Sequence, residues 1–454
     1  MSRLSAHIND AGITLLGDSN ILYREPGFAL VDEQQLDTGN EAFAQARVHP
    51  RRIQHRFWSE LSTAPLADQR FAHLSAADLV SRQLEQMWQD HASGSDGIVI
   101  AVPSYMDTQQ LGLLLGIAAE INMPVTALVD AAVAATRREY RNAVPVHLDM
   151  SLHSAMLTRL SQPGLVQADR SEVIEDCGVY VLYDSWLRTV AEAFVQQSRF
   201  DPLHTAETEQ LLVNRLGGWL SEASRADAVR LSIEFRGAEY SAELESLTLV
   251  DAVAPVYQQI ASRLRAIFRA DDTPALQVTD RVSRLPGLTD MLSARVGGEV
   301  FVLEPGATAR GALARCRDSS SGSSVSLRRQ LPWDQTAVDI GRELAERRSG
   351  GVPTHVLFGS TAWKIGNSPL DMGSQDTGAE RTIVLDGDMP GLSRRHCSVI
   401  QANGQCILQD HSRYGTFLNG HRIDGTSILQ IGDVVRIGTP GFEFHLITTD
   451  ENHG

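Results

Sequence analysis

A continuous apolar run at residues 97–102, GIVIAV, constrains the fold more than any other feature of this chain. Runs of this kind are typical of strands buried on both faces, since helices cover both sides of the sheet. Asp107 can cap a following helix, and residues 125–129 form a second apolar run. Asp130 can cap an alanine-rich helix, after which residues 144–149 form a third run. This alternation predicts a mainly parallel sheet with a binding crevice at the carboxyl ends of its strands.

The chain divides into three regions by composition. Residues 1–315 alternate apolar runs with amphipathic stretches, which indicates an α/β domain. Residues 316–354 include the sequence DSSSGSSVS at 318–326 and have little apolar periodicity, so we expect a flexible linker there. Residues 355–454 contain short β-type runs separated by Gly, Asn and Asp, which predicts an all-β sandwich.

Composition excludes several classes of function. The formal net charge of −16 argues against general nucleic-acid binding, which needs a basic surface. The four cysteines form no CxxC pair, so we expect neither a zinc site nor a disulfide framework. No apolar run approaches the ~18 residues of a membrane span, and the first ten residues lack the apolar stretch of a signal peptide. We therefore expect a cytoplasmic protein without a metal, nucleic-acid or membrane partner.

Four segments of the last region carry a resemblance to a known family. They are WKIGN at 363–367, LSRRH at 392–396, DHSRYGTFLNG at 410–420 and LQIGDVVRIG at 429–438. In this order and at this spacing they resemble the forkhead-associated (FHA) family over essentially the whole region. The resemblance implies a β-sandwich whose loops bind a protein that carries phosphothreonine.

The same resemblance implies which residues contact the phosphate. Ser393 matches the serine whose hydroxyl binds the phosphate, and the adjacent Arg394 can add charge-assisted hydrogen bonds. His396 matches a position that braces the loop. The expected phosphopeptide site consists of Ser393, Arg394, Arg413, Ser412, Asn367 and Asn419.

Two positions depart from the family pattern. Asn367 follows Gly366 where the family usually has an arginine that grips the phosphate, and Tyr414 replaces an asparagine that holds the peptide backbone. Three arginines could supply the lost charge: Arg394, Arg395 and Arg413. The alternative is an FHA fold that no longer binds phosphate.

Residues 1–315 resemble the nucleotide-binding domain shared by actin and the seventy-kilodalton heat-shock chaperones. The segments that carry this resemblance are GNEA at 39–42, the long stretch from IVIAVP to DAAVAA at 98–135, SRLPGLTDML at 283–292 and EPGATARGAL at 304–313. The resemblance implies a two-lobed α/β fold of the actin-like, ribonuclease-H-like class.

The phosphate-binding loops implied by this resemblance lack most of their glycines. The first loop is expected at residues 12–20, GITLLGDSN, and the second at 149–154, where DMSLHS replaces Asp-x-Gly-Gly-Gly-Thr. Asp280 and Arg281 occupy the place of two further glycines. Side chains at these positions block the close approach of backbone N–H groups to phosphates. We therefore expect a pseudo-ATPase with no required cofactor, and residual binding of ATP and magnesium stays open. The nucleotide-site residues that remain are Asp149, Ser19 and Arg284.

We interpret the chain as a phosphothreonine-dependent scaffold or adaptor in which an FHA module is tethered to a pseudo-ATPase domain. Two alternatives stay open: an actin-like ATPase regulated by its FHA domain, and an assembly protein in which both sites are degenerate. The chain also contains a candidate ligand. Asp339 lies three residues after Thr336, and several FHA domains prefer an aspartate at that distance from phosphothreonine. Phosphorylated Thr336 could then bind its own FHA module or that of a second copy.

Overall fold

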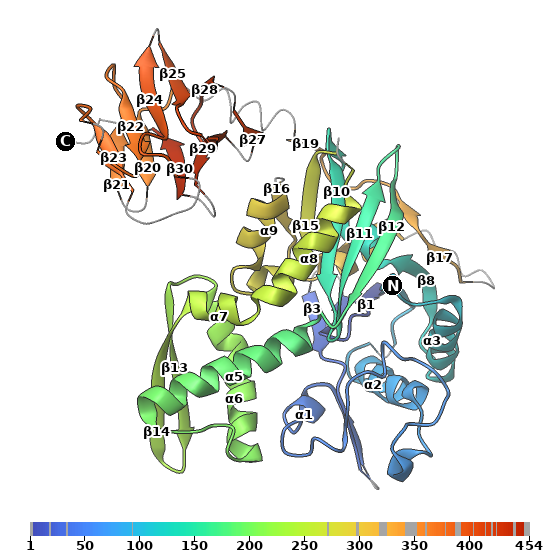
Figure 1. Cartoon of the computed structure of the whole chain (residues 1–454). Coiled ribbons are helices and arrows are strands. Elements are labelled where there is room, and N and C mark those ends of the chain that lie inside the picture. The colour runs from blue at the N-terminus through green and yellow to red at the C-terminus, as the bar shows by residue number, and fades with distance from the viewer. Residues whose placement is uncertain are drawn as a thin grey trace. The chain divides into compact units, whose positions relative to one another are not determined.

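The structure is a computed structural model of the whole chain (Figure 1). The residues that it leaves undescribed are 1–2, 18–19, 33–34, 93, 270–271, 297–298, 317–324, 341–351, 359–360, 377, 386–391, 403, 414, 419–420, 424, 439–441 and 449–454. Its contacts divide the chain into two compact units, residues 1–338 and 339–454. No helix in the described part of the chain combines the length and the apolar character that a membrane crossing requires.

The first sheet of the N-terminal unit joins an antiparallel meander to a parallel pair of strands. Its strands, in order across the sheet, are β17 (Leu327–Arg328), β8 (Val125–Asp130), β7 (Gly97–Val102), β1 (Arg3–His7), β2 (Ile13–Gly17) and β3 (Asn20–Glu25). β1, β2 and β3 are antiparallel neighbours, whereas β7 and β8 run parallel to β1. Every residue of β7 is buried, as its apolar run predicts.

The second sheet repeats this arrangement. Its strands, in order, are β16 (Glu299–Val302), β15 (Pro274–Val278), β10 (Val144–Met150), β11 (Ser154–Ser161), β12 (Val166–Glu175) and β18 (Gln330–Leu331). β10, β11 and β12 form the antiparallel meander, and β15 and β16 run parallel to β10. The prediction of a single mainly parallel sheet is therefore wrong, because the third apolar run, in β10, begins a second sheet of mixed direction.

The predicted helix caps are present. Asp107 accepts a hydrogen bond from the Gln110 backbone N–H at the start of α3 (Thr108–Glu120), and Asp130 caps α4 (Ala131–Ala135) in the same way. The first sheet and these helices belong to the first half of the unit. The remaining elements of that half are β4 (Ala29–Val31), β5 (Leu36–Thr38), α1 (Gly39–Phe43), β6 (Ile53–Gln54), η1 (Gln69–Phe71), α2 (Ala76–His91) and β9 (Tyr140–Arg141). The side chains of Asp107 and Asp130 thus satisfy backbone N–H groups that the first turns of α3 and α4 leave without a partner inside the helix.

The second half carries a helical insertion between β12 and β15. Its elements are α5 (Val179–Ser198), α6 (Ala206–Ala223), β13 (Ala228–Phe235), β14 (Ala238–Glu245), α7 (Ser246–Ala252) and α8 (Ala254–Ile267), and then come η2 (Val282–Arg284), α9 (Leu288–Val296) and α10 (Ala307–Arg315). In α5, Trp186, Val190 and Phe194 are fully buried. This apolar stripe belongs to the core of the second half.

Helices α4 and α10 pack together between the two sheets. Gly311 of α10 has no room for a side chain, because an added Cβ would lie 1.9 Å from the Ala134 carbonyl oxygen. The buried guanidinium of Arg315 donates hydrogen bonds to the carbonyls of Val133, at 3.0 Å, and Thr136, at 2.9 Å. These carbonyls end α4, where a positive charge is favourable. The two halves are thus joined by direct contact between their backbones.

The segment that follows α10 does not agree with the expected linker of residues 316–354. β17 pairs with β8 of the first sheet and β18 pairs with β12 of the second. β19 (Val338–Asp339), at which the N-terminal unit ends, pairs with β9. We call residues 325–338 the strap. The expectation of a flexible linker is wrong for the strap, because its backbone hydrogen bonds extend both sheets.

The C-terminal unit is a sandwich of two sheets. One has the order β21 (Thr361–Lys364), β20 (His355–Phe358), β30 (Phe442–Ile447), β29 (Val434–Ile437), β26 (Phe417–Leu418) and β27 (His421–Arg422). The other has the order β23 (Thr382–Val384), β22 (Leu370–Gly373), β24 (Cys397–Ala402), β25 (Gln405–Asp410) and β28 (Thr426–Leu429). Buried side chains from both sheets form one core, for example Val435, Phe444, Met372 and Leu408. The predicted all-β sandwich is confirmed.

Candidate functional site

His396 braces two loops of the C-terminal unit. Its side chain is fully buried just before β24. Nδ1 lies 3.1 Å from the Ser393 backbone nitrogen, and Nε2 lies 3.2 Å from the Gly415 carbonyl oxygen. A backbone N–H only donates and a carbonyl only accepts, so the imidazole carries its hydrogen on Nε2. Burial lowers the pKa of His396, which favours this neutral form.

The second of these loops, residues 410–416, is held by its own side chains. Asp410 Oδ1 accepts hydrogen bonds from the Ser412 backbone N–H, at 2.9 Å, and from Thr416 Oγ1, at 2.8 Å. Although burial raises the pKa of Asp410, hydrogen bonds from Ser412 and Thr416 outweigh it and lower the pKa. Ser412 Oγ accepts from the Gly415 N–H at 2.7 Å. These hydrogen bonds hold the described residues of the loop, 410–413 and 415–416, together.

The residues expected to contact phosphate meet between the two loops. Ser393 Oγ accepts a hydrogen bond from the Arg413 backbone N–H at 3.3 Å, which leaves the hydroxyl hydrogen free for a ligand. Arg394 and Arg413 are exposed, and their side chains have no hydrogen-bond or ion-pair partner among the described residues. Arg395 instead pairs with buried Asp371, with Nε 2.8 Å from Oδ2. Of the three candidate arginines, Arg394 and Arg413 thus have no partner among the described residues, whereas Arg395 is paired.

Other expected residues are not brought into this group. Asn367 is exposed, and within the described ranges no interaction links it to the Ser393 loop. Asn419 lies outside the described residues, as does Tyr414.

Two further arginines lie beside glycines of the family motifs, although the sequence analysis did not select them. Arg422 lies beside Gly415 of the Arg413 loop, whereas Arg381 lies beside Gly366, at the opposite end of β22 and β24 from Ser393. Arg381 donates a hydrogen bond to the Lys364 carbonyl, and its Nη1 would lie 3.2 Å from a Cβ added to Gly366. Arg422 Nε would lie 2.4 Å from a Cβ added to Gly415, whose φ is +97°. Neither arginine belongs to a family motif quoted above, so only the fold reveals them.

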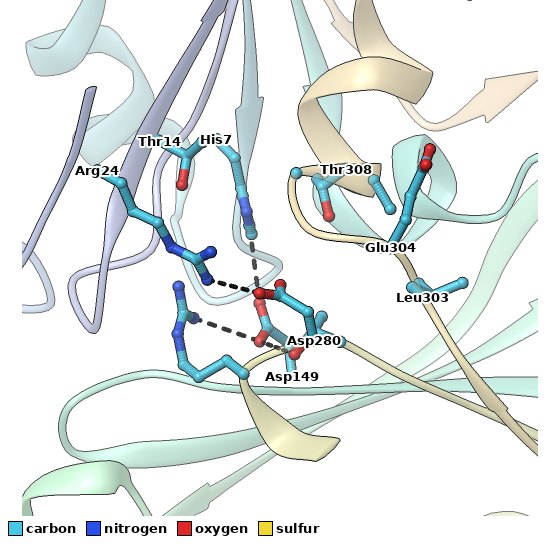
Figure 2. A pocket seen from close by; sticks show the side chains of 12 residues that line it. His7, Thr14, Arg24, Asp149, Asp280, Leu303, Glu304 and Thr308 are labelled. Atoms are coloured by element: carbon cyan, nitrogen blue, oxygen red, sulfur yellow. Dashed lines mark hydrogen bonds and ion pairs between the residues drawn. The ribbon is translucent and has the colours of Figure 1, made fainter. Parts of the chain in front are cut away.

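In the N-terminal unit, Asp149 lies buried near the end of β10, among residues from both halves (Figure 2). Asn9 Nδ2 donates to its Oδ2 at 2.7 Å, and Thr279 Oγ1 donates to its Oδ1 at 2.8 Å. Arg281 Nη1 lies 3.4 Å from Oδ1, and His7 Nε2 lies 3.7 Å from Oδ2. Burial raises the pKa of Asp149, but the charges of Arg281 and His7 outweigh it, so that the pKa is lowered.

Arg281 fills the space between the two hairpins of the sheets. Its guanidinium donates to the Met150 carbonyl, at 3.0 Å, and to the Gly12 carbonyl, at 3.1 Å. The cavity that remains beside Asp149 has a volume of about 20 Å³. This is close to the space of one water molecule, and it is far too small for a phosphate chain.

A second link also connects the two hairpins. The Leu152 N–H donates to Asp10 Oδ1 at 2.7 Å, and burial raises the pKa of Asp10 to about 6. Asp280, which precedes Arg281 in the sequence, pairs with Arg24 at 3.0 Å (Figure 2). It also pairs with Arg284. Arg284 therefore pairs with the Asp280 carboxylate rather than being free to contact the adenine of a nucleotide.

The first hairpin turn is not where the sequence analysis expected it. β1 ends at His7 and β2 begins at Ile13, so the turn comprises residues 8–12. Residues 12–20 instead cover β2 and the first residue of β3, and residues 18–19, which include Ser19, lie outside the described residues. The expected position of the first loop is therefore wrong.

Comparison with known proteins identifies a domain family for one part of the chain. No curated protein matches it. The FHA domain family model matches residues 363–438, within the C-terminal unit. The match includes the Ser393 loop, His396 and the Arg413 loop. The C-terminal unit of this chain therefore contains an FHA domain.

Proposed function

We propose that this protein is an adaptor that binds partners through phosphothreonine. FHA domains bind proteins that contain phosphothreonine. The observation that carries the proposal is the group formed by Ser393, Arg394 and Arg413. The Ser393 hydroxyl accepts from the Arg413 backbone N–H, and the exposed side chains of the two arginines have no partner among the described residues. A phosphate dianion needs such donors, and arginine can bind it through two parallel hydrogen bonds.

The test is a titration of the full chain with a degenerate phosphothreonine peptide library and with the same library lacking phosphate. Binding should require the phosphate and should be lost in Ser393→Ala. A matched control is Ser427→Ala, which lies in β28, at the edge of the sheet that contains β24. Equal binding of the two libraries would refute phosphate recognition and favour an assembly surface.

We propose further that the N-terminal unit is an actin-like domain that does not hydrolyse ATP. The repeated sheet order supports the fold, since each half has a meander followed by two strands parallel to its first strand. The position of Arg281 supports the loss of activity, because a positive side chain and a cavity of about 20 Å³ stand between the hairpins. Purified full chain should show no ATPase activity and no magnesium-dependent thermal shift with ATP. Turnover that Asp149→Ala abolishes would contradict this proposal.

Phosphorylated Thr336 is proposed as a ligand of the FHA domain, in cis or in a second copy. Thr336 is exposed, so a kinase can reach it. The residues on both sides of Thr336 are bonded to the segment that follows α4. Asp334 pairs with Arg137 at 2.6 Å, and Val338 donates its N–H to the Glu139 carbonyl at 2.8 Å. The strap must release these contacts before Thr336 can enter a binding site.

A peptide of residues 331–342, with and without phosphate on Thr336, tests this directly. It is titrated against full-length Thr336→Val, which has no competing phosphosite at that position. Only the phosphorylated peptide should bind. Equal affinity of the two peptides, or none at millimolar concentration, would refute the role of Thr336 without affecting the proposal for other phosphothreonine partners.

A further inference from the structure

A second cavity of the N-terminal unit is distinct from the one beside Asp149. Its volume is about 300 Å³, and Ala11 of the first hairpin and Leu152 of the second both line it. Phe43 lines it from α1, and Tyr183 and Val213 line it from α5 and α6. Figure 1 shows α1 beside α5 and α6. The cavity is therefore enclosed by elements of both halves.

Gln210 of α6 fixes the two sides of the cavity to each other. Its Oε1 accepts a hydrogen bond from the Arg47 backbone N–H at 2.8 Å, and its Nε2 donates to the Phe43 carbonyl at 3.1 Å. The side chain of Gln210 is itself buried. The cavity is thus already formed in the absence of a ligand, as small-molecule sites usually are.

The lining is largely apolar and carries no unmatched charge. Arg47 is the charged residue of the lining, and its guanidinium lies 3.2 Å from Glu209 and 3.9 Å from Asp184. Phe28 and Phe43 meet edge to face, with ring centroids 5.1 Å apart. A charged ligand would lose its hydration without gaining a free counter-charge. An uncharged ligand has no such penalty.

His55, which lines the cavity, has a tautomer that its contacts with His153 determine. Nε2 of His153 lies 3.0 Å from the His55 carbonyl oxygen and 3.0 Å from His55 Nδ1. The carbonyl can only accept, so His153 Nε2 carries a hydrogen and His55 Nδ1 faces it with a lone pair. Burial, with His153 and Arg56 nearby, lowers the pKa of His55 to about 4. Neutral His55 then has its hydrogen on Nε2, which has no partner among the described residues.

We propose that this cavity binds an uncharged, planar and mainly apolar small molecule that accepts a hydrogen bond from His55 Nε2. An apolar cavity of about 150 Å³ is large enough for benzene. The cavity here has twice that volume, so the ligand class is a bicyclic heteroaromatic compound with an acceptor atom in its ring. This function is independent of phosphothreonine binding, which belongs to the other unit.

Quinoline, naphthalene and N-methylquinolinium provide matched probes of this proposal. The first two differ in one ring nitrogen, which is a hydrogen-bond acceptor, and the third adds a charge and blocks that acceptor. Saturation-transfer NMR and titration with the full chain should show binding of quinoline. Naphthalene should bind about twofold to tenfold more weakly, as expected for one neutral hydrogen bond. Absence of quinoline binding at millimolar concentration, or equal binding of the cation, would overturn the proposal.

Three variants locate the binding. Val213→Trp should abolish quinoline binding by filling the cavity, whereas Val195→Trp, on the exposed side of α5, should leave it unchanged. His55→Phe keeps a ring but removes the donor, so quinoline and naphthalene should bind it equally well. Circular dichroism checks the fold of each variant, and His55→Phe decides the matter if Val213→Trp does not fold. A preference for quinoline that survives His55→Phe would refute the assigned donor.

Discussion

Replacement of His396 by alanine should destabilise the FHA domain through the two loops that this side chain connects. The substitution removes both hydrogen bonds of a fully buried imidazole and leaves the Ser393 N–H and the Gly415 carbonyl without these partners. A buried backbone group left unsatisfied costs about 1–3 kcal/mol. Partial relaxation of exposed loop residues reduces the sum, so we expect a loss of about 2–4 kcal/mol from the free energy of unfolding, against the ~5–15 kcal/mol typical of a domain.

The same side chain should contribute to the pH dependence of stability. Because the folded pKa of His396 is lowered, the unfolded chain binds a proton at a higher pH than the folded chain does. Its contribution is therefore fully present above the unfolded pKa of about 6.5 and is lost as the pH falls through the folded value, with a slope of at most ~1.4 kcal/mol per pH unit. The slope below about pH 6.5 should be smaller in His396→Ala.

Urea unfolding of residues 339–454 measures both effects. His445→Ala is the matched control, because His445 is exposed in β30 and its replacement should change stability by less than ~0.5 kcal/mol. Phosphopeptide affinity should fall in His396→Ala and not in His445→Ala. A loss of stability below ~1 kcal/mol, together with an unchanged pH slope, would refute the reasoning on the brace.

Other substitutions separate binding from stability. Arg394→Ala should weaken phosphopeptide binding by about tenfold or more, whereas Arg395→Ala should leave Asp371 buried without its cation and lower stability instead; titration and urea unfolding of both variants would contradict this if the effects were reversed. Arg281→Ala should lower the stability of the N-terminal unit by about 3–5 kcal/mol, measured by thermal unfolding, and an unchanged melting temperature would argue against its bridging role. Leu331→Ala should cost about 2–5 kcal/mol and make the strap sensitive to limited proteolysis, and protease resistance equal to that of the wild type would contradict it.

Local features of the fold could be predicted from the sequence because they depend on neighbouring residues. The apolar run of β7 reports burial on both faces, and Asp107 caps the helix that directly follows it. The FHA motifs placed His396 at the brace because the family fixes both the residue and its spacing.

Features that depend on distant pairing could not be predicted in this way. Periodicity shows that β10 is buried but not which strands pair with it, so the second sheet was missed. Arg281 meets Gly12 across 269 positions of sequence, and no local pattern encodes that contact. The strands of the strap have two residues each, which is too short for a periodic pattern, so its order comes from the sheet edges and cores that receive it. Arg381 reaches Gly366 for the same kind of reason.

The strap determines how the N-terminal unit would respond to mechanical force. β18 is bonded to one sheet and β17 to the other, with only Arg329 between them. Tension that a partner applies to the FHA domain enters the N-terminal unit at Val338 and travels back along the strap. It therefore loads β19, which pairs with β9, before β18, and β18 before β17, so that the second sheet yields its edge strand before the first sheet does. Single-molecule pulling from the C-terminal end should show these releases in that order, before either sheet itself unfolds.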